Sequence, residues 1–423
     1  MQSPSGIAAI VSAFSNRNYA VYASTNILSH FGSWIQRVAM GWLAWELEKS
    51  GYWLGVVAVA ELVPAVILAP LAGAIADRVN RLRGIQGTQF LAMVQAIILA
   101  GIAISGNATI GWLVGLAFAR GVIMSFNQPL RFSILPSLVE RKDLSSAIGI
   151  NSLSFNLSRV LGPAVAALII AQWDAGTAFA VNAVSYFIFI VALFFIRLDN
   201  PYVPKPRSFK NLPPEIIEGI RYCLQMPGIA PLFILMSVVA MCGRAYAELL
   251  PGFAGLVFDS GVDGLGWLHA AIGVGAVLGS VILARRSSVE GLTRIVAWMV
   301  LVVGLGLIAF SATDNLWIGM FCVAVTGLGM TFVGVGEQQL LQNAVSGEVR
   351  GRVMSLYGMI SRGGPALGAF SMGAATEWIG LQIPVAAGGV CCIILFFWAL
   401  KKAPEMAKSL EKEPGHFYGD RGV

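Results

Sequence analysis

Long apolar segments alternate with short polar ones along the whole chain of 423 residues. Most apolar segments reach about 20 residues, the length that an α-helix needs to cross a bilayer. Their hydrophobic residues are continuous, whereas the strands of a membrane barrel alternate apolar and polar positions. Only helices and closed barrels can cross lipid, because each backbone polar group needs an internal partner. The pattern therefore predicts twelve membrane-spanning helices, near residues 19–47, 52–76, 85–105, 109–130, 144–171, 175–197, 229–257, 265–284, 292–312, 315–336, 351–375 and 383–400.

The composition supports this prediction. Hydrophobic residues make up 57% of the chain and charged residues 12%, against about 25% charged residues in an ordinary soluble domain. A soluble protein of this size has too little interior to bury so much apolar surface. We therefore expect an all-α membrane protein with the lipid bilayer as a partner. The five cysteines show neither metal-ligand nor disulfide spacing, so we expect no metal and no cofactor.

Basic residues concentrate in every second loop. They are Arg78, Arg81, Arg83, Arg131, Arg141, Lys142, Lys205, Arg207, Lys210, Arg221, Arg285, Arg286, Arg350, Lys401 and Lys402. The alternate loops are mainly acidic, and Lys49 is their one basic residue. The positive-inside rule places the basic loops in the cytoplasm. Both termini are then cytoplasmic, which requires an even number of spans, and we expect a multi-pass protein of a bacterial inner membrane. The net charge of +6 is thus explained by membrane orientation, and we expect no nucleic-acid partner.

A polar, proline-rich segment divides the chain in the middle. Such a sequence disfavours a membrane-spanning helix, although residues 215–224 have the pattern of a short amphipathic helix on the cytoplasmic surface. We expect a cytoplasmic N-terminal segment (1–18), an N-terminal six-helix bundle (19–197), a linker (198–228), a C-terminal six-helix bundle (229–401) and a cytoplasmic tail (402–423).

The two halves share a short motif. An arginine precedes a Gly-Pro step in the fifth span of each half, after a basic loop, and this predicts a parallel internal repeat of two pseudo-symmetric bundles. Alternatively, each arginine binds carbonyl groups at the proline bend. The motif residues are Arg159, Gly162 and Pro163 in the first half, and Arg362, Gly364 and Pro365 in the second.

A further motif lies at the end of the second span and in the loop after it. Its residues are Gly73, Asp77, Arg78 and Arg81. It resembles motif A of the major facilitator superfamily, except that Asn80 stands where that family often has glycine. The resemblance implies a latch that stabilises one transport state. The alternative is an ordinary positive-inside loop, but an aspartate has no use in setting orientation.

The resemblance extends over nearly the whole chain. Residues 33–47, 147–164 and 348–369 are similar to the branch that contains the enterobactin exporter and macrolide efflux proteins. The span 5 segment from Gly149 to Ala167 is similar to the superfamily's antiporter motif, with small residues replacing several glycines, and plain helix packing explains it equally well. The resemblance implies a secondary active transporter that exports an amphipathic small molecule by alternating access, in exchange for protons.

Placing a charged residue inside a membrane span is unfavourable in free energy, and charged residues found there usually have a function. Arg37 and Glu61 lie at similar depths, about 15 Å and 14 Å from the outer ends of their spans at ~1.5 Å per residue. Arg244 and Glu248 are four residues apart in the seventh span, which would place them on one helix face. We therefore predict Glu61 and Glu248 as proton-coupling residues. The alternative is that these are ion pairs that only hold helices together.

The predicted cavity is rich in arginine, which favours an anionic cargo such as a siderophore. The alternatives are a multidrug or macrolide-type efflux pump, or a lipid flippase or channel. Arg120 follows Leu116 at the spacing that begins the superfamily's helix 4 motif, but the later part of that motif is missing. The predicted cavity residues are Arg37, Trp34, Arg120, Arg244 and Tyr246.

Other classes of function find no support in the sequence. It contains no H-E-x-x-H or G-x-S-x-G motif, and no Gly-Lys-Ser/Thr phosphate loop. We therefore expect neither an enzyme nor an ATP-driven pump, so that the energy comes from a gradient or a partner. The family resemblance implies a proton gradient, and we expect a monomeric transporter of a small molecule.

Overall fold

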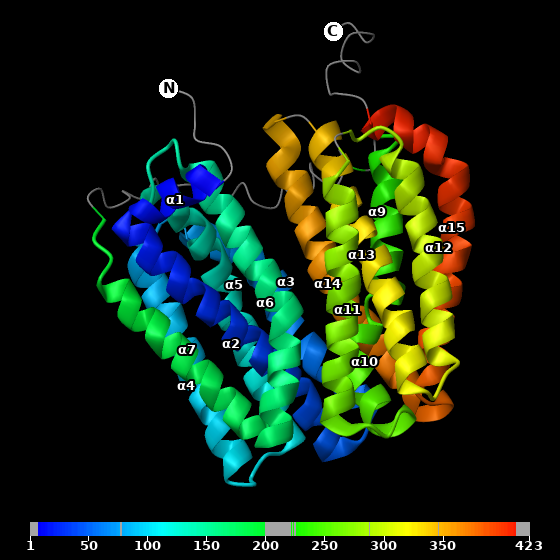
Figure 1. Cartoon of the computed structure of the whole chain (residues 1–423), viewed down its shortest axis with the longest axis horizontal. Coiled ribbons are helices and arrows are strands. Elements are labelled where there is room, and N and C mark those ends of the chain that lie inside the picture. Colours follow the sequence, from blue (N-terminus) through cyan, green and yellow to red (C-terminus); the bar gives the residue numbers. More distant parts are fainter. Residues whose placement is uncertain are drawn as a thin grey trace, which may run out of the picture. The chain divides into compact units, whose positions relative to one another are not determined.

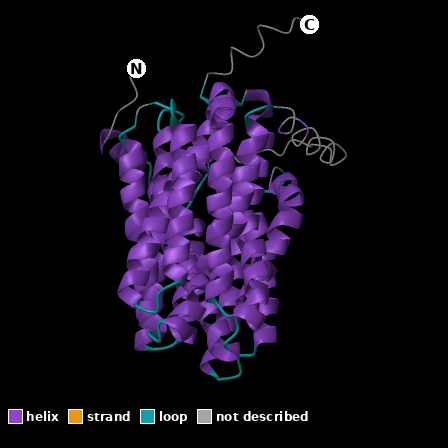
Figure 2. Cartoon of the chain, turned by 90° about the vertical axis from the view of Figure 1, so that its right-hand side faces the viewer, coloured by secondary structure: helices purple, strands orange, loops and turns teal. Residues whose placement is uncertain are grey.

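The computed structural model describes residues 7–76, 78–198, 221, 223, 226–286, 288–345 and 347–411. Within these ranges the chain forms helices and connecting loops, and no strand (Figure 2). The prediction of an all-α fold is confirmed. The amphipathic helix predicted at 215–224 lies outside the described residues except for 221 and 223, as do residues 412–423 of the predicted tail.

The helices follow the predicted spans (Figure 1). Those before the linker are α1 (Ile7–Ser15), α2 (Arg17–Glu48), α3 (Gly51–Ala76), α4 (Arg81–Ile104), α5 (Ile110–Ile134), α6 (Leu144–Gln172) and α7 (Ala175–Phe194). Those after it are α9 (Ile229–Val238), α10 (Tyr246–Gly252), α11 (Gly261–Ala284), α12 (Leu292–Ser311), α13 (Leu316–Ala344), α14 (Gly347–Ile379) and α15 (Gln382–Leu410). The helices α13 and α15 extend past the predicted ends near 336 and 400, because polar turns that hydropathy excludes continue each of them.

The seventh span is one helical rod with two irregular turns. Between α9 and α10 the segment Val239–Gly243 is π-helical, and a second π-helical turn, Phe253–Val257, follows α10. The amide of Arg244 donates to the carbonyl of Val239 at 3.0 Å, and that of Glu248 donates to Ala245 at 3.1 Å. The helix is therefore not regular between Arg244 and Glu248, and the prediction that four-residue spacing puts both side chains on one α-helical face rests on a wrong premise.

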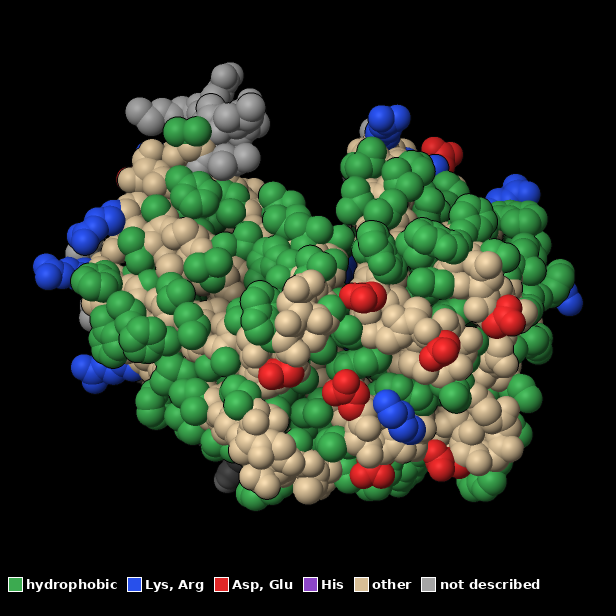
Figure 3. Space-filling view, turned by 60° about the horizontal axis from the view of Figure 1, so that its bottom comes forward, with side chains coloured by type: hydrophobic (Ala, Val, Ile, Leu, Met, Phe, Trp, Pro, Cys, Tyr) green, Lys and Arg blue, Asp and Glu red, His purple; other side chains and the backbone are tan. Residues whose placement is uncertain are grey.

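The helices carry apolar side chains on their outer surfaces. Ten of the described helical segments are long and apolar enough to cross a membrane. The helices α2 and α14 have the length, with 32 and 33 residues, but carry more polar side chains. Large hydrophobic side chains are exposed along many helices, up to 83% for Trp378, and Figure 3 shows them over most of the visible helix surfaces. Lipid is the solvent that suits such a surface.

The chain divides into two compact units. The first comprises residues 1–48 and 60–209, and the second comprises 49–59 and 210–423. The division falls inside α3, so that the first part of this helix, up to Val59, groups with the C-terminal helices. Glycines explain the close packing there: a β-carbon built at Gly55 would lie 2.6 Å from the carbonyl oxygen of Ala369 on α14, and one built at Gly373 would overlap the carbonyl oxygen of Gly51. In addition, the hydroxyl of Ser50 donates to the carboxylate of Glu377 at 2.6 Å.

In the first unit the last helix ends beside the start of α2, and in the second unit α15 ends beside the start of α12. In the first unit, the side chain of Asn18 donates to the carbonyl of Arg197 at 2.7 Å and accepts from its amide at 3.3 Å. In the second unit, the carboxylate of Glu411 accepts the amides of Gly291 and Thr293 at 2.7 and 2.9 Å, where it also offsets the positive end of the α12 dipole. The contact of Asn18 with Arg197 is the one expected of a unit built from an even number of spans.

Candidate functional site

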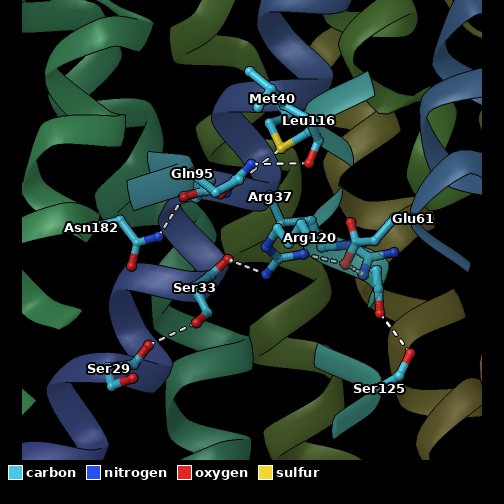
Figure 4. Close-up of polar contacts among 12 residues, drawn as sticks. Ser29, Ser33, Arg37, Met40, Glu61, Gln95, Leu116, Arg120, Ser125 and Asn182 are labelled. Carbon is cyan, nitrogen blue, oxygen red and sulfur yellow. Dashed lines mark hydrogen bonds and ion pairs between the residues drawn. The ribbon is translucent and has the colours of Figure 1, made fainter. Parts of the chain in front are cut away.

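A carboxylate and two arginines meet inside the first unit. Glu61 on α3 forms an ion pair and hydrogen bond with Nη1 of Arg120 on α5. Nη1 of Arg37 on α2 lies 3.7 Å from the same oxygen. Figure 4 shows the three side chains converging from three helices. The prediction that Arg37 and Glu61 lie at one level is confirmed.

The burial of the three groups differs. The side chain of Arg120 is 7% exposed, that of Glu61 20% and that of Arg37 38%. Arg120 is thus the buried partner, while the side chains of Arg37 and Glu61 are partly exposed at the surface of the unit. Burial favours the neutral form of a carboxyl group, and neighbouring guanidinium groups favour the ionised form. These opposing effects meet at Glu61.

The backbone positions this group. A β-carbon at Gly121 would overlap the carbonyl oxygen of Glu61, so glycine at this place lets α5 approach α3 closely. Nη2 of Arg120 donates to the carbonyl oxygen of Ser33 at 3.2 Å, which ties α5 to α2. The hydroxyl of Ser33 in turn donates to the carbonyl oxygen of Ser29 at 2.8 Å. Arg120 is therefore held from both sides.

A chain of amide side chains lies beside this site. Asn182 on α7 donates to Gln36 on α2 at 2.6 Å, and Gln36 donates to Gln95 on α4 at 2.9 Å. Gln95 completes the chain by donating to the carbonyl oxygen of Leu116 on α5 at 3.1 Å. These bonds join four helices (Figure 4). Buried polar networks of this kind are stable only when their members are satisfied, and this one fixes the helices that carry Arg37 and Arg120.

Trp34 forms an aromatic wall next to the charged group. The guanidinium carbon of Arg37 lies 5.8 Å from the centre of the Trp34 ring, within the range of a cation–π contact. The Trp34 ring also contacts Phe155 on α6, with ring centres 6.3 Å apart. Trp34 is half-buried, so its placement agrees with the predicted cavity role without testing it.

The predicted pair of the second unit, Arg244 and Glu248, is carried by the irregular part of the seventh span. Arg244 lies against α13, where a β-carbon at Gly334 would be 3.1 Å from its Nη2. Glu248 is half-buried on α10. Tyr246 is 3% exposed, and its ring lies 6.0 Å from that of Phe310 on α12. Tyr246 is therefore packed in the core of its unit in this conformation, and its role in a cavity remains a prediction.

The two Gly-Pro motifs make equivalent contacts in the two units. A β-carbon at Gly162 on α6 would lie 2.6 Å from the β-carbon of Trp34 on α2, and one at Gly364 on α14 would overlap the β-carbon of Ala240 in the seventh span. The fifth span of each half thus packs closely on the first through a glycine. Pro163 is buried and Pro365 half-buried within their helices, whereas Arg159 and Arg362 are exposed, and their roles remain predictions.

The structure describes three of the four residues of the proposed latch, Gly73, Arg78 and Arg81. Gly73 is half-buried near the end of α3, and Arg78 and Arg81 are half-buried at the start of the next segment. Asp77 lies outside the described residues. Asn80 caps α4 by accepting a hydrogen bond from the amide of Arg83 at 3.1 Å, which explains why asparagine suits a position where the superfamily often has glycine.

Arg131 is a buried charged residue whose location was predicted incorrectly from the sequence. It was assigned to a cytoplasmic loop, but it lies within α5 and is 6% exposed. Its guanidinium donates to Asn26 at 2.8 Å and to Ser29 at 2.7 Å and lies 4.9 Å from the ring of Phe189. The polar residues of α2, one turn apart, were the signal in the sequence that such a group would be accommodated.

The family model described as transmembrane secretion effector matches residues 8–418. The chain belongs to this family of the major facilitator superfamily. The match covers the helices of both units, so the whole membrane-spanning part of the chain belongs to a family of transporters.

Relatives within the superfamily carry names of transporters. The chain is 26% identical to the staphyloferrin A transporter of Staphylococcus aureus, over 90% of this chain and 96% of the relative. It is 20% identical to macrolide efflux protein A of Streptococcus pyogenes, over 81% and 85% of the two chains. With the multidrug efflux pump Tap of Mycobacterium tuberculosis it shares 24% identity, over 87% and 91%.

Solved structures agree on the fold. The bacterial homologue of the human lysosomal transporter Spinster, in its inward-facing and unoccupied conformation, superposes with a TM-score of 0.73 at 16% identity, covering 93% of this chain and 98% of that chain. The peptide transporter POT gives a TM-score of 0.72 at 15% identity, covering 93% and 95%. The family member described here therefore has the major facilitator fold, with about twelve membrane helices in two bundles.

Proposed function

We propose that the protein is a secondary active exporter that moves an amphipathic, anionic small molecule out of the cell in exchange for protons, with Glu61 as a proton-binding group. The observation that carries the proposal is the contact of Glu61 with Arg120 and Arg37 inside the membrane-spanning part of one unit. When Glu61 binds a proton, it loses its charge and releases both arginines from the ion pair. An anionic cargo can then bind to the half-exposed Arg37.

The relatives support the choice of cargo class. One relative is named for the siderophore staphyloferrin A, and others for macrolides or for multiple drugs. The two arginines at one carboxylate favour the anionic siderophore-like class, because they leave a positive charge in excess when Glu61 is neutral. Macrolide-type efflux is the second candidate, supported by the aromatic pair Trp34 and Phe155, which suits an uncharged amphipathic cargo.

The test is transport in proteoliposomes with an imposed pH gradient, using staphyloferrin A and a macrolide as separate probes. We expect gradient-driven movement of staphyloferrin A, and loss of the gradient dependence in Glu61→Gln. The matched control is Glu46→Gln, because Glu46 is an exposed acid at the end of α2. Gradient-driven transport that is unchanged in Glu61→Gln contradicts the proton role of Glu61, and movement of the macrolide alone selects the second candidate.

The remaining features of the proposal follow from the sequence and the family. We infer a bacterial inner-membrane location, cytoplasmic termini and a monomeric state, and the alternation of basic and acidic loops supports the cytoplasmic termini. Glu248 remains a proposed second coupling residue. Motif A, with Gly73, Asp77, Arg78 and Arg81, remains a proposed latch, and Asp77→Asn is expected to change the balance of inward- and outward-facing states in accessibility labelling.

A further inference from the structure

A second carboxyl group is buried in the C-terminal unit, away from the Glu61 group. Glu337 lies on α13 and is 4% exposed. Its Oε1 atom is buried and has no hydrogen-bond partner among the described residues. A buried polar atom without a partner is rare in folded proteins and needs an explanation.

Apolar packing surrounds this carboxyl group on its own helix. Leu340 and Leu341, on the next turn, are fully buried. The preceding residue, Gly336, packs against α12, where its β-carbon would lie 2.5 Å from Val296. An ionised carboxylate in such surroundings is unfavourable unless a donor or a cation reaches it, whereas a protonated carboxyl group is tolerated.

One cation is placed to reach it. This cation is Arg244 of the seventh span, which is half-buried. Its Nη2 lies at the surface of α13 beside Gly334, three residues before Glu337 and therefore on the same helix face. The carbonyl oxygen of Gly334 already accepts the hydroxyl of Tyr357 from α14 at 3.1 Å. The missing side chain at Gly334 thus leaves the space in which the guanidinium lies.

The backbone that carries Arg244 is irregular. Arg244 directly follows the π-helical turn Val239–Gly243, and its amide bonds to Val239 at 3.0 Å. Single π-helical turns inside membrane helices occur frequently at functional sites. Regular α-helix beyond this turn would rotate Arg244 about the axis of the seventh span, so the irregular turn sets how the guanidinium faces α13.

We propose that Glu337 is a proton-binding group of the C-terminal unit, and that Arg244 holds its ionised form. The proposal assigns a proton to Glu337 in this conformation, because an unpartnered buried Oε1 costs less in a neutral carboxyl group than in an ionised one. On losing its proton, the carboxylate becomes a partner for Arg244. A role of Glu337 in transport rests on the proposed function of proton-driven export. The binding of a proton at Glu337 does not depend on that function.

Infrared difference spectroscopy of the purified full-length protein tests the proton directly. A protonated carboxyl group in an apolar site gives a C=O stretching band that shifts in heavy water and disappears on ionisation. We expect this band in the native protein at neutral pH, its loss in Glu337→Gln and its presence in Glu290→Gln. Glu290 is the control because it lies exposed in the loop before α12. An identical carboxyl band in Glu337→Gln and the native protein overturns the proposal.

Arg244→Gln tests the partner. Removing the cation takes away an interaction that favours the ionised form, so the carboxyl band is expected to persist to higher pH than in the native protein. A band that disappears at the same pH in both proteins overturns the role of Arg244.

Chemical labelling covers the case in which Glu337→Gln does not fold. Dicyclohexylcarbodiimide is a membrane-soluble reagent that reacts with protonated carboxyl groups, and modified peptides are located by mass spectrometry. We expect modification of Glu337 in the native protein that declines as the pH rises, and no modification there at any pH overturns the proposal. Both readouts are independent of transport, so a loss of coupling in Glu61→Gln and a proton at Glu337 are confirmed or rejected separately.

Discussion

Gly121 on α5 lies against the carbonyl oxygen of Glu61 on α3, with no space for a β-carbon between them. This contact brings the neighbouring Arg120 to the Glu61 carboxylate. Small residues generally let membrane helices approach closely, and here the close approach also builds the charged site. The geometry of that site is therefore sensitive to a single methyl group.

We predict that Gly121→Ala destabilises the protein by about 1–3 kcal/mol, the usual cost of adding volume to a packed interface. The added methyl group would push α5 away from α3 and lengthen the Arg120–Glu61 contact. Thermal unfolding in detergent measures the change. Gly115→Ala is the control on the same helix, because a β-carbon at Gly115 meets no described atom within 4 Å. Equal melting temperatures of the two variants would contradict the interpretation.

The buried amide chain gives a second prediction. Gln36→Leu removes the central member of the chain, so the Nδ2 of Asn182 and the Oε1 of Gln95 lose the hydrogen bonds that they make to Gln36. A buried polar group that loses its partner costs about 1–3 kcal/mol, so we expect a clear loss of thermal stability. Asn156→Ala is the control, because Asn156 is exposed and bonds only to Ser152 on its own helix. If both variants unfold alike, the amide chain does not stabilise the unit.

Much of this fold was predictable from the sequence, because the membrane restricts the choice. Continuous apolar segments gave helices with nearly correct ends, and residue depth placed Arg37 beside Glu61. The depth of a residue in the membrane follows from its number of residues from the end of the span. The direction of its side chain can be predicted only if the helix is a regular α-helix.

Sequence reasoning is weakest where regular geometry fails. The π-helical turn before Arg244 has no signature in hydropathy, so the direction of the Arg244 side chain could not be predicted. Likewise, the packing of Phe310 against Tyr246 joins distant segments and could not be predicted from the residue types. The ion pair between Arg120 and Glu61 was missed because its residues belong to different helices whose facing sides depend on Gly121.

Membrane orientation is tested by reporter fusions. We predict that a fluorescent protein that folds only in the cytoplasm will be bright when fused after Val423 and when fused before Met1. The reason is that basic loops stay in the cytoplasm and that the two ends of the first unit meet, through Asn18 and Arg197. A fusion after Gly106, in the loop between α4 and α5, is the control and should be dark. A bright signal there and a dark one at the C-terminus would reverse the orientation.

A double substitution tests whether Arg120 and Glu61 act as a pair. Removing one member of a buried ion pair costs about 3–5 kcal/mol, because the other charge stays buried without compensation, whereas replacing both often costs little. Arg120 is the more buried member, so Glu61→Gln alone should destabilise the protein more than the double variant with Arg120→Gln. Unfolding temperatures of the two single variants and the double variant in detergent measure this. Simple addition of the two single effects would show that the charges do not depend on each other, and the release of the arginines on protonation of Glu61 would then lose its physical basis.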